Sequence, residues 1–132
     1  MVDRQDAELP MQLARESFAR WADAFSAADV ELLVRLYTEN AMMYGSRPQL
    51  LRGHDAIRDY LGSFSALGPK QIRFQQVSAE WAGPCAVSAA ADAVLRFGGG
   101  NTEVFMRFTH VLVDEQQAWK IACHHASPTP SS

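Results

Sequence analysis

The chain has 132 residues, of which 48% are hydrophobic and 20% are charged, so it is long enough for one globular domain over residues 1–132 and too short for a two-domain enzyme. This composition excludes disorder over most of the chain. Twelve Lys and Arg residues against fifteen Asp and Glu leave a net charge of -3. This argues against a nucleic-acid-binding protein, because phosphate binding relies on a stripe of basic residues and the sequence has none.

The beginning of the chain is predicted to be helical. From Leu9 to Ala27 apolar residues recur at spacings of three and four, which indicates an amphipathic helix with Pro10 in its first turn. A second, short helix is expected after Asp29, whose carboxylate can cap the following amides. Its apolar positions extend to Tyr37.

A short strand, a loop and a third helix are expected next. The strand covers residues 41–44 and the loop residues 45–53, and whether this loop acts as a lid stays open. Residues 57–64 again carry apolar side chains at helical spacing, and Gly68–Pro69 ends the third helix.

After Pro69 the apolar pattern changes to a period of two, which indicates antiparallel strands. Apolar residues alternate on one parity up to Phe74 and on the other from Val77, so a β-bulge is expected near Gln75 or Gln76. Three helices followed by strands are typical of an α+β domain with its helices on one face of a curved sheet. The four long strands are predicted near 70–82, 85–97, 103–113 and 119–127.

The face of the sheet beneath the helices follows from the parity of these strands. A hairpin turn centred on Gly99–Gly100 pairs Leu95 with Val104, Ala93 with Met106, Ala91 with Phe108 and Ala89 with His110. An even-numbered turn within residues 114–117 adds Trp119, Ile121, Cys123 and His125. This face is almost wholly apolar, and its alanines either leave room for a pocket or allow close helix packing.

The polar members predicted on this covered face are His110, Cys123 and His125. If the last turn lies at Gln116–Gln117, His110 faces Cys123, and His125 is a diagonal neighbour at roughly 7–8 Å. Each histidine is either a core imidazole bonded to a neighbour or a polar anchor or general base. Without a nearby carboxylate the ligands are too few for a metal, so neither a metal nor another cofactor is expected.

The opposite face of the sheet is predicted to pair Arg96 with Glu103 and Asp92 with Arg107, with His124 close to Arg107. No helices form a cleft there, so such a row is more typical of structural ion pairs than of a catalytic group. Several apolar side chains share this face and should not be left in water, which indicates sheet-to-sheet dimerisation. They are Val94, Phe105, Val111 and Val113.

The cellular location and the state of the cysteines are expectations from composition. The first ten residues include acidic side chains and no apolar core, and no later apolar run approaches the ~20 residues of a membrane helix, so a cytoplasmic protein is expected. Cys85 and Cys123 are expected to be reduced thiols, because a chain of this size builds a core without a disulfide.

Four segments carry a resemblance to a known family. They are W-A-x-A at 21–24, the helix at 29–37, R-x-T at 107–109 and W-K-I-x-x-H-H-x-S-x-x-P at 119–130. With them the chain resembles the nuclear-transport-factor-2-like (NTF2-like) superfamily. It is most similar to small bacterial proteins grouped with the association domain of calcium/calmodulin-dependent protein kinase II and with SnoaL-like polyketide cyclases.

The resemblance implies a cystatin-like cone, in which a curved antiparallel sheet carries three N-terminal helices on its concave face and encloses a pocket. It also implies a dimer formed through the outer face, with Arg107 and His124 there beside Asp92. Where the kinase domain places arginines in its pocket, this chain has Ala91, His110 and Ala126, which argues against an anionic ligand. The pocket lining implied by resemblance is Trp21, Tyr60, Phe108, His110, Trp119, Cys123 and His125.

Three functions are compatible with these features. The first is a homodimer that binds a small apolar, aromatic or polyketide-like molecule, oriented by His110 and His125. The second is an isomerase, dehydratase or cyclase in which one of these histidines takes a proton while a tyrosine hydroxyl stabilises the enolate. The third is an assembly module whose function is the oligomer itself.

Overall fold

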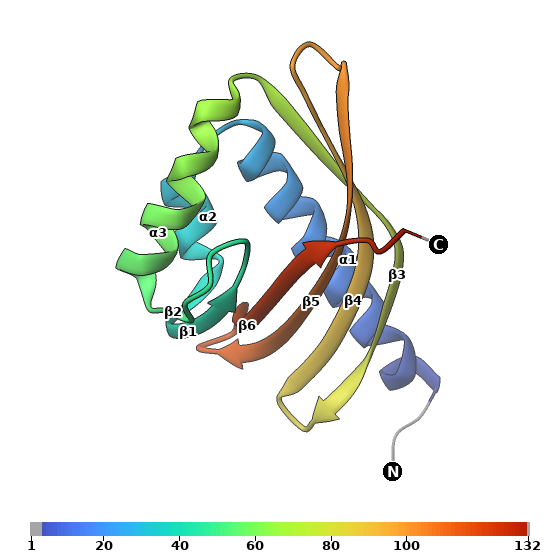
Figure 1. The fold of residues 1–132 in the computed structure, drawn as a ribbon. Coiled ribbons are helices and arrows are strands. Elements are labelled where there is room, and N and C mark those ends of the chain that lie inside the picture. Colours follow the sequence, from blue (N-terminus) through green and yellow to red (C-terminus); the bar gives the residue numbers. More distant parts are fainter. Residues whose placement is uncertain (1–3, 132) are drawn as a thin grey trace.

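The computed structural model describes residues 4–131 as one curved six-stranded sheet with its helices on one side (Figure 1). The predicted α+β class is confirmed. The helices are α1 (Arg4–Ser26), α2 (Val30–Arg35), α3 (His54–Gly62) and the 3-10 helix η1 (Ser63–Leu67). The strands are β1 (Tyr37–Tyr44), β2 (Leu51–Arg52), β3 (Lys70–Gly83), β4 (Ala86–Phe97), β5 (Thr102–Glu115) and β6 (Ala118–Pro128).

The sheet is mixed and has the strand order β2-β1-β6-β5-β4-β3. Strands β3 to β6 form the predicted antiparallel meander, and their neighbours in the chain are their neighbours in the sheet. The sequence analysis missed two features, the parallel pairing of β1 with β6 and the short strand β2 inside the expected loop. A parallel pair joins segments far apart in the chain, so no local turn signal announces it.

The N-terminal helix packs its apolar stripe onto the sheet. Ala14, Phe18, Trp21 and Phe25 are all buried at the predicted helical spacing, and most contacts of α1 are with β3. The cap at Asp29 is confirmed, because its side chain accepts a hydrogen bond from the Leu32 N–H over 3.1 Å. The short helix ends at Arg35. Tyr37, which was predicted to lie on this helix, is instead the first residue of β1.

The strand register is mostly as predicted. Ala89 lies opposite His110 and Ala91 opposite Phe108. The bulge in β3 is also confirmed, since the register shifts between Gln75 and Ser78 and Gln76 has a φ of 54°.

The register of β6 corrects the prediction for its second half. The turn lies at Gln116–Gln117, and Leu112 pairs with Ile121, but the next pair is Val111 with Cys123. One extra residue in β6 reverses the parity of everything that follows it. The predicted inward orientation of Cys123 and His125 is therefore wrong, as is the outward orientation of His124, which lies opposite His110 on the covered face.

Parts of the two chain ends that were predicted to be flexible have regular backbone structure. Of the ends predicted to be flexible (residues 1–8 and 128–132), residues 1–3 and 132 lie outside the described part. Residues 4–8 belong to α1, and the Thr129 N–H donates to the Phe105 carbonyl over 2.9 Å. No helix among residues 4–131 is long and apolar enough to cross a membrane.

Candidate functional site

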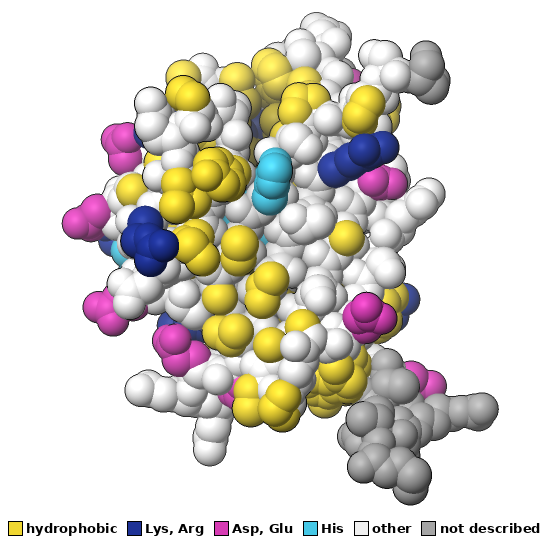
Figure 2. Space-filling model, turned by 60° about the horizontal axis from the view of Figure 1, so that its bottom comes forward, with side chains coloured by type: hydrophobic (Ala, Val, Ile, Leu, Met, Phe, Trp, Pro, Cys, Tyr) yellow, Lys and Arg dark blue, Asp and Glu magenta, His cyan; other side chains and the backbone are white. Residues whose placement is uncertain are grey.

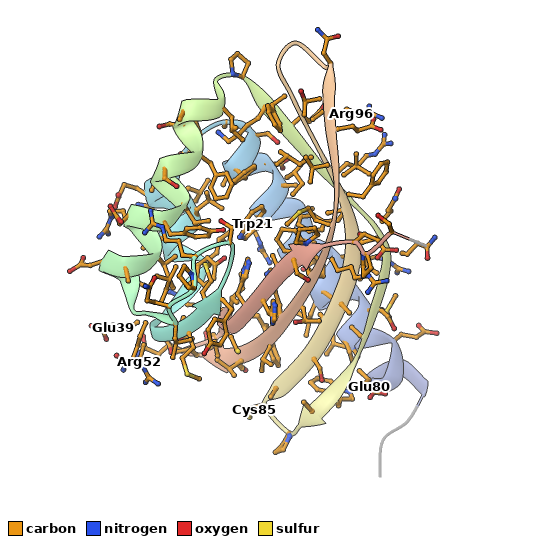
Figure 3. The ribbon with its side chains drawn as sticks, in the orientation of Figure 1. Trp21, Glu39, Arg52, Glu80, Cys85 and Arg96 are labelled. Carbon is orange, nitrogen blue, oxygen red and sulfur yellow. The ribbon has the colours of Figure 1, made fainter. Side chains whose placement is uncertain are left out.

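A chain of buried hydrogen bonds joins the helices to the centre of the sheet. The Trp21 indole N–H donates to the Tyr37 hydroxyl over 2.8 Å, and this hydroxyl lies 2.8 Å from Nδ1 of His124. The same Nδ1 lies 3.0 Å from Nε2 of His110. Figure 3 shows Trp21 in the interior, whereas the labelled Cys85 lies at the surface.

Each member of this chain comes from a different element. Trp21 lies on the sheet-facing stripe of α1, and His110 and His124 are register partners on β5 and β6. Tyr37 is brought to them by the parallel pairing of β1 with β6, where it lies beside Ile121. The site therefore depends on two features that the sequence analysis did not predict, the parallel pairing of β1 with β6 and the bulge in β6.

Aromatic rings surround the two imidazoles. Phe18 stacks on His110 with ring centroids 4.8 Å apart and an interplanar angle of 23°. Phe108 presents itself edge-on to His110 at 6.1 Å and to His124 at 5.3 Å. Only 2% of the His110 surface and 3% of the His124 surface is exposed, so this environment is apolar and dry.

Burial keeps the titratable side chains of this hydrogen-bonded series uncharged. It lowers the pKa of His110 to about 3 and, together with the neighbouring His110 and His125, lowers the pKa of His124 well below its ordinary value. Burial also raises the pKa of Tyr37. All three groups are neutral near pH 7, so they exchange hydrogen bonds rather than charges.

His110 has one nitrogen without a partner. Its Nδ1 is buried and makes no hydrogen bond, although its Nε2 contacts His124. Most buried polar atoms in proteins are hydrogen-bonded, so this orphan nitrogen limits the tautomer that His110 can adopt.

A small cavity of about 40 Å³ lies beside His124 under the helices. Typical ligand pockets measure roughly 300–1,000 Å³, so the interior of the cone is nearly filled. The lining combines apolar side chains of α1, α3, η1 and the sheet with the imidazole of His124. It consists of Trp21, Phe25, Tyr60, Leu61, Phe64, Ile72, Leu95, Met106, Phe108, His124 and Ala126.

The structure brings only part of the predicted pocket residues to this cavity. Trp21, Tyr60 and Phe108 line the cavity. His110 does not line it, but its Nε2 contacts His124, which does. Trp119 lies toward the other end of β5, with its ring 6.1 Å from that of Trp81. Cys123 and His125 lie on the other face of the sheet, where the His125 ring is 6.1 Å from that of exposed Tyr44.

The outer sheet face carries the predicted polar pairs and the apolar residues between them. Arg96 and Glu103 form an ion pair of 2.6 Å, and Asp92 is the register partner of Arg107. An open hollow of about 380 Å³ lies over the small side chains of β3–β6, including Ser88. The exposed apolar side chains gather in the middle of the view in Figure 2, with most charged ones around its rim.

The loop at 45–50 is held onto α3 by Tyr60. The Ser46 N–H donates to the Tyr60 hydroxyl over 2.8 Å, and Arg47 forms an ion pair of 2.9 Å with Asp59. The Arg47 guanidinium also lies 5.2 Å from the centre of the Tyr60 ring. One side chain thus joins this loop to the wall of the cavity.

No group of three His, Cys, Asp or Glu side chains that could hold a metal ion occurs among residues described with their side chains. Cys85 and Cys123 are free, the first exposed and the second partly buried.

The sequence matches the model of the SnoaL-like domain over residues 14–131. No curated protein matches it. A Mycobacterium tuberculosis protein of unknown function superimposes with a TM-score of 0.81 at 15% identity, covering 91% of this chain and 76% of that one.

Two further solved structures are similar over most of both chains. A candidate calcium/calmodulin-dependent protein kinase II association domain from Xanthomonas campestris gives a TM-score of 0.77 at 17% identity, covering 87% and 84%. A candidate dehydratase of the NTF2-like family from Streptomyces avermitilis gives 0.79 at 17% identity, covering 91% and 96%. At these identities the likeness shows the fold alone, and it is the fold that the resemblance implied.

Proposed function

The chain belongs to the SnoaL-like domain family, and from this premise we propose that it binds a small, mostly apolar molecule in the cavity beside His124. The observation that carries the proposal is a single available imidazole edge in an otherwise apolar lining. The polar atoms of the other lining side chains are already used, because the Trp21 N–H bonds to Tyr37 and the Tyr60 hydroxyl to Ser46. An apolar site with one polar anchor is typical of small-molecule sites.

The ligand must make part of its own space. An apolar cavity of roughly 150 Å³ takes up benzene, and the present one has about 40 Å³. Phe64 is the side chain best placed to move, since it is only half-buried and belongs to the short helix η1. Its outward rotation would open the cavity on the side where Met106 is also partly exposed.

Binding is better supported than acid–base catalysis. A general base works best when its pKa lies near the working pH, and burial lowers the pKa of both His110 and His124 far from neutrality. The described lining also contains no carboxylate. The dehydratase name of the Streptomyces structure keeps the enzyme hypothesis open for testing, with His124 then as a hydrogen-bond donor.

The test is calorimetric titration of 1-indanone into the wild-type protein and two matched variants. Ala126→Leu extends a side chain into the cavity, whereas Ala82→Leu makes the same change at an exposed position of β3. We expect saturable binding to wild type and to Ala82→Leu, and none to Ala126→Leu. No binding to wild type, or equal binding to both variants, would refute the proposal.

A second candidate function is self-assembly through the outer sheet face, as in the third hypothesis. It is favoured by the nearly filled interior together with exposed apolar side chains on that face, where Phe105 is 53% and Tyr44 47% exposed. A second copy could fill the hollow on this face and pair its Arg107 with Asp92 across a twofold axis.

Sedimentation velocity tests this homodimer. Phe105→Asp places a charge on the outer face, and Leu32→Asp places one on α2 at a residue that is 39% exposed. We expect a dimer for wild type and Leu32→Asp and a monomer for Phe105→Asp. A monomeric wild type, or a Phe105→Asp variant that stays dimeric, would contradict the assignment of this face.

A further inference from the structure

We infer that the cavity selects ligands that offer a neutral hydrogen-bond acceptor, such as a ketone, ester or lactone oxygen. The reason is that the hydrogen bonds from Trp21 through Tyr37 to His124 fix a hydrogen on Nε2 of His124. This inference rests on the proposed function and defines the class of ligand. It assigns positioning roles to Trp21 and Tyr37, which belong to no predicted catalytic set.

The direction of the hydrogen bonds starts at Trp21. An indole nitrogen can only donate, so the Tyr37 oxygen is the acceptor in their 2.8 Å hydrogen bond. The hydroxyl hydrogen of Tyr37 must then point to its other partner, Nδ1 of His124, also 2.8 Å away. If Nδ1 instead carried a hydrogen, the Tyr37 hydroxyl hydrogen would be buried without an acceptor.

His110 is consistent with the same direction. Two lone pairs cannot face each other across the 3.0 Å between Nε2 of His110 and Nδ1 of His124, so Nε2 of His110 carries the hydrogen. The unpartnered Nδ1 of His110 is then a lone pair and not an N–H.

The single lone pair on Nδ1 of His124 is thus shared between the Tyr37 hydroxyl, at 2.8 Å, and Nε2–H of His110, at 3.0 Å, and the neutral ring carries its hydrogen on Nε2. His124 lines the cavity. Because its Nδ1 is already engaged by Tyr37 and His110, the Nε2–H is the imidazole group left to meet a molecule there. A bound ligand must therefore accept a hydrogen bond.

The lining also excludes charged ligands. Among the described residues around the cavity there is no Lys, Arg, Asp or Glu, so a carboxylate or an ammonium group would be buried without a counter-charge. The Tyr60 hydroxyl does not serve as a partner for a charged ligand, because it accepts a hydrogen bond from the Ser46 N–H on the side of the loop.

The first arm of the test compares 1-indanone with indane, which has the same ring system without the oxygen. We expect the ketone to bind about tenfold more tightly or better, because indane offers no acceptor to the Nε2–H of His124. Indane-1-carboxylate should bind more weakly than 1-indanone. Equal affinity for 1-indanone and indane would overturn the inference while leaving the proposed function intact, whereas absence of binding by 1-indanone would overturn the proposed function itself.

The second arm needs no ligand. Long-range proton–nitrogen NMR of the histidine rings reports which nitrogen carries the hydrogen, and we expect Nε2–H for His124 in the free wild-type protein. Tyr37→Phe should bring the Nδ1–H tautomer of His124 into the population and reduce the preference for 1-indanone. The control Tyr44→Phe, an exposed tyrosine of the same strand, should change neither readout. An Nδ1–H tautomer in wild type would overturn the inference even if the Tyr37 variant failed to fold.

Discussion

Acidification should destabilise this protein through its buried histidines, and His110 allows the effect to be worked out. Its pKa is about 3 in the folded state against about 6.5 in an unfolded chain. The unfolded state therefore binds more protons between these values, so the stability from neutral His110 is fully present above about pH 6.5 and is lost as the pH falls toward 3.

Between pH 7 and pH 5 the linkage relation gives a loss of about 2 kcal/mol in the free energy of unfolding for His110. His124 has the same sign, because its pKa is also lowered by burial, and it adds to the loss over the same range. A contribution of this size is a large fraction of the total stability of a small domain, roughly 5–15 kcal/mol.

Urea denaturation at pH 7 and pH 5 measures the loss. His110→Gln keeps a hydrogen-bond donor but cannot titrate, so its loss should be smaller than that of wild type by about 2 kcal/mol. Ala82→Gln, a change at an exposed position of β3, should lose as much free energy as wild type. If wild type and His110→Gln lose the same free energy, His110 takes up a proton as readily in the folded state as in the unfolded one, and the argument for a neutral site fails.

Two backbone predictions follow from close contacts and turn geometry. Gly45→Ala should destabilise the protein by roughly 1–3 kcal/mol, because a Cβ there would overlap the Tyr60 hydroxyl; Gly83→Ala, with no atom within 4 Å, is the matched control in a thermal denaturation series. Replacing Gln116–Gln117 by Asn-Gly should stabilise the hairpin by about 1 kcal/mol, because both residues have positive φ, and an unchanged midpoint in urea would contradict this.

The sequence is most informative where side-chain size and turn residues leave a clear pattern. The glycine turn between β4 and β5 fixed the pairing of Ala89 with His110, and the change of parity in β3 revealed its bulge at Gln76. In β3 the larger apolar side chains alternate with polar ones on each side of the bulge, so a slip of one residue would bury the wrong set.

The second half of β6 lacks such contrast, which explains the error there. After Ile121 the residues are Ala, Cys, His, His and Ala, and either parity places comparable side chains under the helices. The two consecutive histidines make the alternatives equivalent in composition. Only pairing with β5, where His124 meets His110, distinguishes them.

Tyr37 was missed as a site residue for a different reason. Its spacing from Val30, Leu33 and Val34 fits a helix, but Leu36 ends the helix and Tyr37 begins a strand. Its partner strand lies at the far end of the chain, so helical periodicity was the only local signal available.

The parallel pairing of β1 with β6 also has a consequence for the order of folding. The hydrogen bond between Tyr37 and His124 joins residues 87 positions apart, whereas β3 to β6 can assemble through short hairpins. Long-range contacts require closure of large loops, and they slow folding relative to local ones. The Trp21 indole would stay hydrated until this last long-range contact forms, so its fluorescence in a stopped-flow refolding trace would report closure of the whole domain, provided that the signals of the other two tryptophans are removed.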